Sequence, residues 1–172
     1  MGADTTPSPG LLTSSLTEAQ NGNLSVSFGD SIRVSADEFV YIERDCIAFK
    51  EEIRALQRLA QNISRREKWG LGEFTEGLES SKVLVGWFRG KAKIVDASKD
   101  TSNNVWDILE QHYQIVDQLQ QLHHVIAQKY VETDQEFAAE YNALMANAPA
   151  SPIGKVQIQP GVVPQSPAVG AP

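Results

Sequence analysis

The sequence is poor in the features that mark several large protein classes. It holds a single cysteine, Cys46, so neither an internal disulfide nor a cage of thiolate metal ligands can stabilise the fold. No apolar run approaches the roughly 18 residues of a membrane-spanning helix, so we expect no stable membrane anchor. The first basic residue is Arg33. A positively charged segment ahead of an apolar stretch is therefore missing, and we expect no Sec-type signal peptide.

Basic residues are in the minority. The chain of 172 residues carries 22 Asp and Glu against 15 Lys and Arg, which gives a formal net charge of -7 with the three histidines neutral. Duplex nucleic acid and anionic lipid both attract basic surfaces. The composition therefore argues against a nucleic-acid partner and against a protein held on anionic lipid.

Proline is absent from the middle of the chain and concentrated at its ends. Residues 1–30 are rich in Thr, Ser, Gly, Asn and Pro, and we interpret them as a flexible N-terminal arm. Residues 147–172 hold six of the eight prolines and one charge, Lys155, which predicts a disordered tail because so little can be buried. The proline-free segment 31–146 is predicted to be one helical domain.

A heptad-like seam marks the first helix, which we predict at about 36–66. Ser35 precedes it as an N-cap, and Glu38 three residues later completes the pattern of a capping box. Apolar residues alternate at spacings of three and four, which is typical of a helix that packs along another helix. The seam consists of Phe39, Ile42, Cys46, Phe49, Ile53, Leu56, Ala60 and Ile63.

Two further helices are predicted at about 76–99 and 102–146. The stretch Asp100–Asn104 favours caps and turns, so we expect a break there rather than one helix from 76 to 146. The same seam returns beyond it, at Val105, Ile108, His112, Ile115, Leu119, Leu122 and Ile126. The predicted fold class is all-α, a helical hairpin or an elongated helical bundle with disordered N- and C-terminal tails.

Residues that could carry catalysis are few and badly spaced. His112, His123 and His124 do not form the H-E-x-x-H spacing of a zinc site on a helix, and no glycine-rich loop follows a strand. Cys46 occupies a seam position without a neighbouring histidine, which fits a small buried apolar group. We therefore predict a non-enzymatic protein without metal or cofactor. A helical-bundle metalloenzyme that uses the three histidines is the remaining enzymatic alternative.

Two short motifs suggest recognition instead. Trp69, Gly70 and Gly72 form a turn after the first helix, with Phe74 beside it. At the end of the last seam, Tyr130 and Asp134 stand four residues apart, which would place them on one helix face. Tyr41–Asp45 and Tyr113–Asp117 have the same spacing, but only the third pair lies at the end of the helical core.

Together, the hairpin, the tryptophan–glycine turn and the terminal Tyr-x-x-x-Asp resemble the WXG-like, ESX secretion-associated substrates of actinobacterial type VII secretion. The resemblance implies synthesis in the bacterial cytoplasm and export of the folded helical protein, usually as a dimer, to the outside or the cell envelope. It also implies that the secretion ATPase reads Tyr130 and Asp134, together with the turn, as an export signal. The expected partners are a helical protein, as a homodimer or heterodimer, and that ATPase.

A cytosolic coiled-coil adaptor or chaperone is the alternative function. It would use the same seam residues to hold a partner protein and would never leave the cell. The seam itself does not separate the two possibilities, and only the context of Tyr130 favours export.

Overall fold

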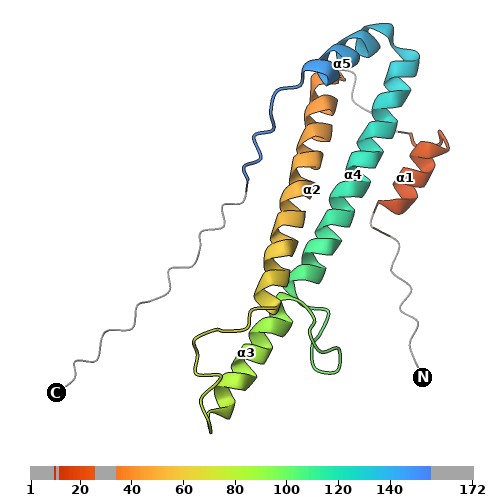
Figure 1. Ribbon diagram of the computed structural model, residues 1–172. Helices are drawn as coiled ribbons and strands as arrows, with labels where there is room; N and C mark the ends of the chain where they lie inside the picture. The colour runs from red at the N-terminus through yellow and green to blue at the C-terminus, as the bar shows by residue number, and fades with distance from the viewer. Residues whose placement is uncertain (1–9, 11, 26–33, 156–172) are drawn as a thin grey trace.

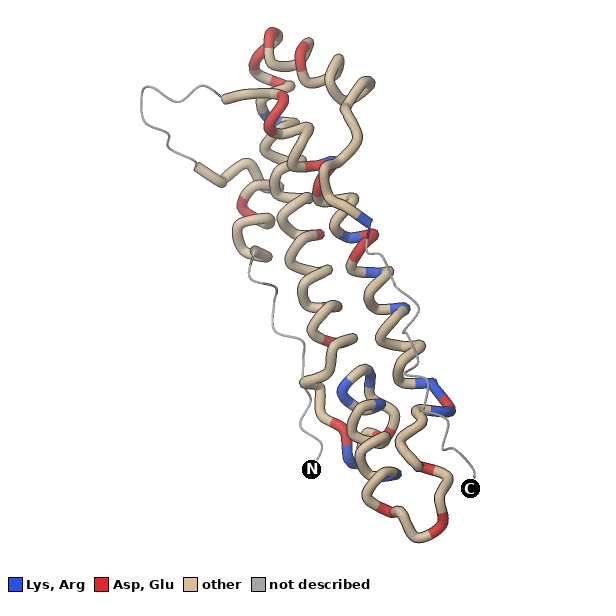
Figure 2. The backbone as a smooth tube through the Cα atoms, turned by 90° about the vertical axis from the view of Figure 1, so that its left-hand side faces the viewer, with Lys and Arg blue, Asp and Glu red and all other residues tan. Residues whose placement is uncertain are grey.

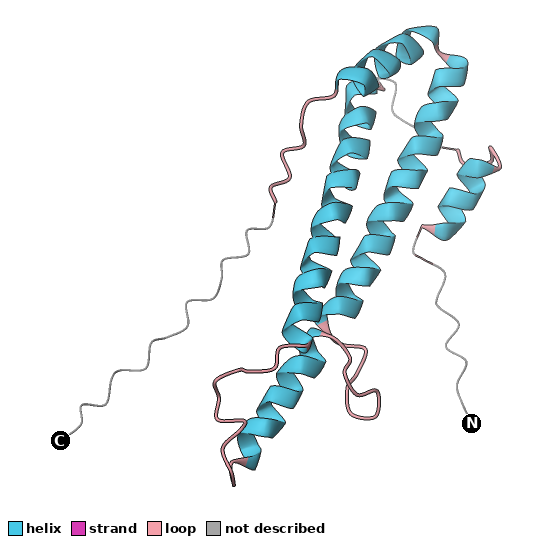
Figure 3. Ribbon diagram, viewed as in Figure 1, coloured by secondary structure: helices cyan, strands magenta, loops and turns pink. Residues whose placement is uncertain are grey.

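The computed structural model describes residues 10, 12–25 and 34–155 of the chain. Its elements are all helices, and no strand occurs among the described residues, which confirms the predicted all-α fold (Figure 3). The helices are α1 (Thr13–Gln20), α2 (Ala36–Ser64), α3 (Glu79–Ala92), α4 (Val105–Thr133) and α5 (Gln135–Asn147).

An antiparallel hairpin of α2 and α4 dominates the molecule (Figure 1). Each of these helices has 29 residues, which corresponds to roughly 43 Å at 1.5 Å per residue. At one end α5 folds back and packs against both α2 and α4. At the other end lies α3, between two loops, and α1 lies alongside α4. The hairpin therefore has two long sides and two chemically different ends.

The core consists of two clusters along the hairpin. The first joins α2, α4 and α5 through Ala36, Val40, Ala127, Phe137 and Tyr141. The second, nearer the middle, joins Cys46 and Ile53 of α2 to Val116 of α4. Cys46, Ile53 and Ala60 of the predicted α2 seam are buried, so the periodicity located part of the inner face of α2.

The ends of α2 match the prediction, but its cap does not. Ser35 occupies the N-cap position, yet its hydroxyl donates to the carboxylate of Asp37 instead of accepting from the helix. The Asp37 carboxylate in turn accepts from the backbone N–H of Glu38 at 3.0 Å. The predicted capping box is therefore wrong, because the nearer carboxylate outcompetes the serine hydroxyl for the first turn.

The expected break near residue 100 is confirmed, and it makes α3 shorter than predicted. Residues 93–104 form a loop in which the Asp100 carboxylate accepts from the backbone N–H groups of Val95 and Asp96, at 2.8 and 2.9 Å. Asn104 then caps α4 by accepting from the N–H of Asp107 at 3.0 Å. Side chains that bind the backbone locally thus stop the helix at Ala92 instead of 99.

A second break was not predicted. The expected helix 102–146 is divided at Asp134, whose carboxylate accepts from the N–H groups of Glu136 and Phe137 at 2.9 and 3.1 Å. These bonds satisfy donors at the start of α5 that no helical carbonyl can reach. The chain turns at this residue, and α5 packs back on the hairpin.

Both predicted tails contain ordered parts. Within the segment 1–30, α1 buries Ala19, and Gln118 of α4 accepts from the N–H of Leu12 at 3.3 Å. After α5, the carbonyl of Pro149 accepts from Arg44 at 3.2 Å, and Ser151 donates to Asp45 at 2.7 Å. The expectation of an arm and a tail without structure was therefore too broad. Residues 1–9, 11, 26–33 and 156–172 lie outside the described residues.

Candidate interaction surfaces

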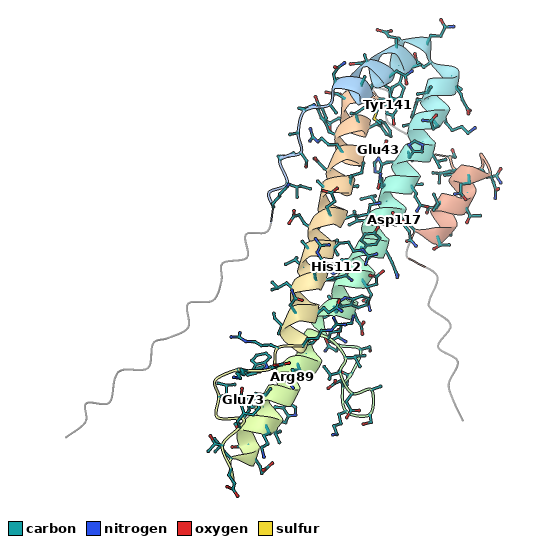
Figure 4. The ribbon with its side chains drawn as sticks, in the orientation of Figure 1. Glu43, Glu73, Arg89, His112, Asp117 and Tyr141 are labelled. Carbon is teal, nitrogen blue, oxygen red and sulfur yellow. The ribbon has the colours of Figure 1, made fainter. Side chains whose placement is uncertain are left out.

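Polar contacts close one long side of the hairpin. Lys50 pairs with Asp117 at 2.6 Å, and Glu43 faces His124 at 3.4 Å (Figure 4). Beyond Lys50 along α2, Arg54 pairs with Glu110. The partners descend along α4 as they ascend along α2, as an antiparallel arrangement requires. We call this the closed side, defined by the two ion pairs Lys50–Asp117 and Arg54–Glu110 and by the contact between Glu43 and His124.

The polar contacts of the closed side extend inward. The amide of Gln57 donates to Glu110 at 2.9 Å and to the carbonyl of Trp106 at 3.3 Å. The hydrogen bond from Gln57, with Arg54 next, lowers the pKa of Glu110 below its ordinary value. The guanidinium of Arg54 also lies over the ring of Tyr113, 3.7 Å from its centroid. Each charge on this side has a partner that holds its side chain in place.

The opposite long side is apolar and largely uncovered. We call it the open side, and it consists of Phe49, Leu56 and Ile63 of α2 with Ile108, Ile115 and Leu119 of α4. Each of these residues directly precedes a residue that points toward the other helix. In an antiparallel pair, such positions lie on the same side of both helices. Phe49 is 45% exposed and Ile115 is 39% exposed.

The open side corrects the predicted packing of α4. The predicted seam was Ile108, His112, Ile115, Leu119, Leu122 and Ile126. The residues that face α2 lie one position later: Leu109, Tyr113, Val116, Gln120, His123 and Ala127. Ile108 and Ile115 are therefore neighbours of the inner face, not members of it. On α2, Phe49 and Ile63 are likewise exposed although the seam predicted them inside.

The short helix α1 covers the α4 surface toward α5. A groove of about 320 Å³ separates the two helices and is lined by Ala19, Gly22 and Leu24 on one wall and by Ile126 and Tyr130 on the other. Gln118 anchors α1 through Leu12 and Thr13. This arrangement leaves Leu122 and Ile126 less exposed than Ile108 and Ile115.

The predicted signal residues Tyr130 and Asp134 lie at the corner between α4 and α5. Tyr130 is half-buried, and its ring packs against Phe39 and Phe137 at centroid distances of 6.1 and 5.3 Å. Asp134 is exposed and is both the C-cap of α4, where its backbone N–H donates to the carbonyl of Tyr130 at 2.8 Å, and the N-cap of α5. The two residues are therefore one helical turn apart, but the Asp134 carboxylate is used to cap α5. A sequence signal for this cap did exist, since an Asp followed by Glu136 is typical of a helix start.

The two other Tyr-x-x-x-Asp pairs are integrated into the hairpin. Asp45 is bound by Arg44 at 2.7 Å and by Ser151, which lowers the pKa of its carboxyl, with the Arg44 hydrogen bond as the main cause. The carboxylate of Asp117 accepts a hydrogen bond from Lys50 at 2.6 Å. Of the three Tyr-x-x-x-Asp pairs, Tyr130–Asp134 is thus the one that lies where the chain passes from α4 to α5.

The turn motif is organised by a residue that the sequence analysis missed. The carboxylate of Glu73 accepts from the backbone N–H groups of Trp69, Gly70 and Leu71. These bonds, the one from Trp69 first, lower the pKa of Glu73 to about 2. Gly70 and Gly72 adopt φ values of +74° and +83°, which side chains disfavour. The glycines therefore serve the turn, as predicted.

Trp69 is partly covered and not a free aromatic group. Its ring stacks on Phe88 of α3 with centroids 5.7 Å apart, and its indole N–H donates to the carbonyl of Arg66 at 3.1 Å. Phe74 is 73% exposed. The turn lies at the α3 end of the hairpin, whereas Tyr130 lies at the α5 end (Figure 1). A single chain does not bring the two predicted halves of the signal together.

The histidines lie on different sides of α4. His112 is exposed, His123 packs against Phe39 with its pKa lowered by burial, and His124 faces Glu43. Among residues 10, 12–25 and 34–155, no group of three or more His, Cys, Asp or Glu gathers in the arrangement of a metal site. Cys46 is buried, and burial raises the pKa of its thiol.

Comparisons with known proteins add no relative. No protein-family model matches the chain, and neither a curated protein nor a solved structure matches it. None of the described helices combines the length and the apolar composition needed to cross a bilayer.

Proposed function

We propose that this chain is a non-enzymatic helical protein that binds a second helical chain along the open side of its hairpin. We propose further that it is a WXG-like, ESX-associated substrate or substrate partner of type VII secretion, exported folded with that partner. The observation that carries the proposal is the contrast between the two long sides, because only one of them is closed by the chain's own contacts.

The open side has the chemistry of a helix-binding surface. Its side chains are apolar, and they continue the interface between α2 and α4 without a gap in the heptad pattern. On α4 the uncharged residue Gln111 borders it. An amphipathic helix with an apolar stripe would bury Phe49, Ile115 and Leu119.

Export would use the corner at Tyr130 and Asp134. The half-buried ring of Tyr130 and the exposed carboxylate of Asp134 stand where α4 ends, so a receptor could contact both at a helix terminus. The turn at Trp69 lies at the other end. A receptor that reads both motifs would need to span the hairpin or read the turn from a second, antiparallel chain.

Export is tested in a host that carries the secretion system. We expect Tyr130→Ala to abolish secretion while the protein still accumulates in the cell. Tyr113→Ala serves as the matched control, because it removes a tyrosine of the same spacing from within the hairpin. Since Tyr130 also packs in the core, Asp134→Asn provides a second variant: asparagine keeps the cap on α5 but removes the charge.

The outcomes separate the candidate functions. Undiminished export of a stable Tyr130→Ala variant would reject the signal. Wild-type protein found only in the cell, and bound to a helical partner, would instead support the cytosolic adaptor. The partner itself is tested by Ile115→Gln, which we expect to abolish its binding, whereas Ile47→Gln on the closed side of α2 leaves binding intact.

A further inference from the structure

Exposed apolar side chains are concentrated at the α3 end of the molecule. Among the described residues, 17 large apolar side chains are exposed, and nine of them fall within the 25 residues from 71 to 95. They are Leu71, Phe74, Leu78, Val83, Leu84, Trp87, Phe88, Ile94 and Val95. Apolar side chains exposed at this density are more than scattered surface residues would give, and they indicate an interaction surface at this end.

Helix α3 carries the centre of this patch. Val83, Leu84, Trp87 and Phe88 follow helical spacing and form one outward stripe, while Val85 on the rear is buried. Trp87 is 69% exposed, which is the second highest value among these apolar residues after Phe74. Of the stripe, Phe88 alone has an aromatic partner, Trp69. We call these four residues the α3 stripe.

The α3 end has a net charge of the opposite sign to that of the rest of the chain. Residues 65–104 hold eight Lys and Arg against six Asp and Glu, a net charge of +2, whereas the other residues hold seven against 16, a net charge of -9. Blue and red positions are mixed around α3, while red positions dominate around α5 (Figure 2). The acidic composition of the whole chain therefore hides a basic end.

Lys82 pairs with Glu79 at 2.7 Å and Lys99 pairs with Asp96 at 3.4 Å, but three other cations have no carboxylate partner among the described residues. Arg89 donates to the carbonyls of Arg66 and Glu67, Lys91 donates to that of Asn103 at 3.3 Å, and Lys93 lies over the ring of Trp106. Carbonyl and ring contacts do not neutralise a cation as a carboxylate would.

Two of the nearby carboxylates are already engaged by the backbone. Glu73 binds the N–H groups of the turn, and Asp100 binds those of Val95 and Asp96. The α3 stripe is therefore flanked by Arg89, Lys91 and Lys93, none of which forms an ion pair among the described residues.

We infer that α3 lies on the surface of an anionic lipid bilayer, with the α3 stripe in the apolar boundary and the surrounding Lys and Arg at the level of the phosphates. A helix with Trp, Phe and Leu on one face and cations nearby has the composition of an interfacial helix. At 14 residues, α3 is too short to span the bilayer and would lie in its plane.

The charge distribution sets the orientation. With α3 on the membrane, the hairpin carries its acidic α5 end away from the anionic surface (Figures 1 and 2). A protein partner could also cover an apolar stripe, but the basic surroundings favour a negatively charged surface. The attraction between a cation and the anionic membrane surface extends over only about a Debye length. Only the cations at the α3 end therefore contribute to lipid binding. Binding of the α3 stripe to lipid does not depend on the helical partner that we propose for the open side.

The test is flotation of the full chain with phosphatidylglycerol-containing vesicles and with pure phosphatidylcholine vesicles at low salt. We expect at least about tenfold more protein bound to the anionic vesicles, because several cations contribute. Trp87→Ser should reduce the bound fraction several-fold. Phe49→Ser is the matched control, since it removes an exposed aromatic from the open side, and it should bind like the wild type.

A second variant separates charge from apolar contact. Lys91→Glu with Lys99→Glu should weaken binding to anionic vesicles and leave helix content unchanged by circular dichroism. No binding of the folded wild type to anionic vesicles would overturn the inference, as would equal binding to both lipids. Self-association that Trp87→Ser abolishes, without any lipid binding, would assign the α3 stripe to a protein contact and would also overturn it.

Discussion

The two long sides of the hairpin are built from the same two helices but by different chemistry. On the closed side, two ion pairs, the contact between Glu43 and His124, and the hydrogen bonds of Gln57 join α2 to α4. On the open side, no ion pair between α2 and α4 is found within the described residues, and apolar side chains remain partly exposed. The closed side sets which faces of the two helices meet, and the open side has capacity for further burial.

This difference follows from how much each kind of contact contributes. Partly exposed ion pairs stabilise a fold weakly, but they disfavour alternative registers by placing like charges together. Apolar burial contributes far more free energy per contact. A hairpin that left its apolar side uncovered would therefore gain most by adding a partner there and little by adding one on the closed side.

The largest expected effect contrasts a core residue with an open-side residue. Ile53 is 2% exposed, and Ile53→Ala should lower the free energy of unfolding by about 3 kcal/mol through lost burial and a cavity. Ile115→Ala should cost less than about 1 kcal/mol in the isolated chain, because this side chain is already partly in water. Urea unfolding followed by circular dichroism measures both. Equal costs would mean that Ile115 is covered in solution, and the comparison should be repeated at several protein concentrations.

A smaller loss of stability is expected when the hydrogen bond between α5 and α2 is removed. The Tyr141 hydroxyl donates to Glu43 at 2.9 Å, and burial, with this bond second, raises the pKa of Tyr141 to about 12. Tyr141→Phe should cost about 1–2 kcal/mol, since the acceptor is a carboxylate.

The same tyrosine gives the fold a pH dependence with a defined sign. Its neutral form is favoured in the folded state, so its contribution is fully present below the ordinary pKa of 10. That contribution is lost as the pH rises from about 10 to about 12. The melting temperature should therefore fall less steeply between pH 9 and 12 for Tyr141→Phe than for the wild type. Identical pH profiles would remove Tyr141 as the cause.

What could be predicted from the sequence depended on whether one face was clearly apolar. On α2, Cys46 and Ile53 sit in a seam flanked by charge, so the inner face was found. On α4, Ile108 and Ile115 directly precede Leu109 and Val116, so two neighbouring stripes are both apolar. Periodicity cannot choose between them, and the ion pairs with α2 decide.

Apart from the Asp134–Glu136 pattern of a helix start, the features that were missed have weak local signals. No glycine or proline marks the corner at Asp134, and a single carboxylate cap was enough to divide the predicted helix. The helix α1 has eight residues and little apolar surface, and it is held by Gln118, a contact 105 or more residues away in sequence. The turn glycines were identified, but Glu73 was not, because its role depends on a loop geometry that composition does not encode.

The smallest expected effect tests the closed side directly. The side chains of Lys50 and Asp117 are 18% and 34% exposed, so a double-mutant cycle of Lys50→Met and Asp117→Asn should give a coupling of about 0.5–1 kcal/mol. In 1 M NaCl the coupling should fall, because the pair is partly accessible to screening ions. Phe49→Leu with Asp117→Asn is the control cycle and should show no coupling, since Phe49 lies on the open side. A salt-independent coupling would mean that the pair is held by packing around the Lys50 stem, and the closed side would then owe its geometry to apolar contacts as the open side does.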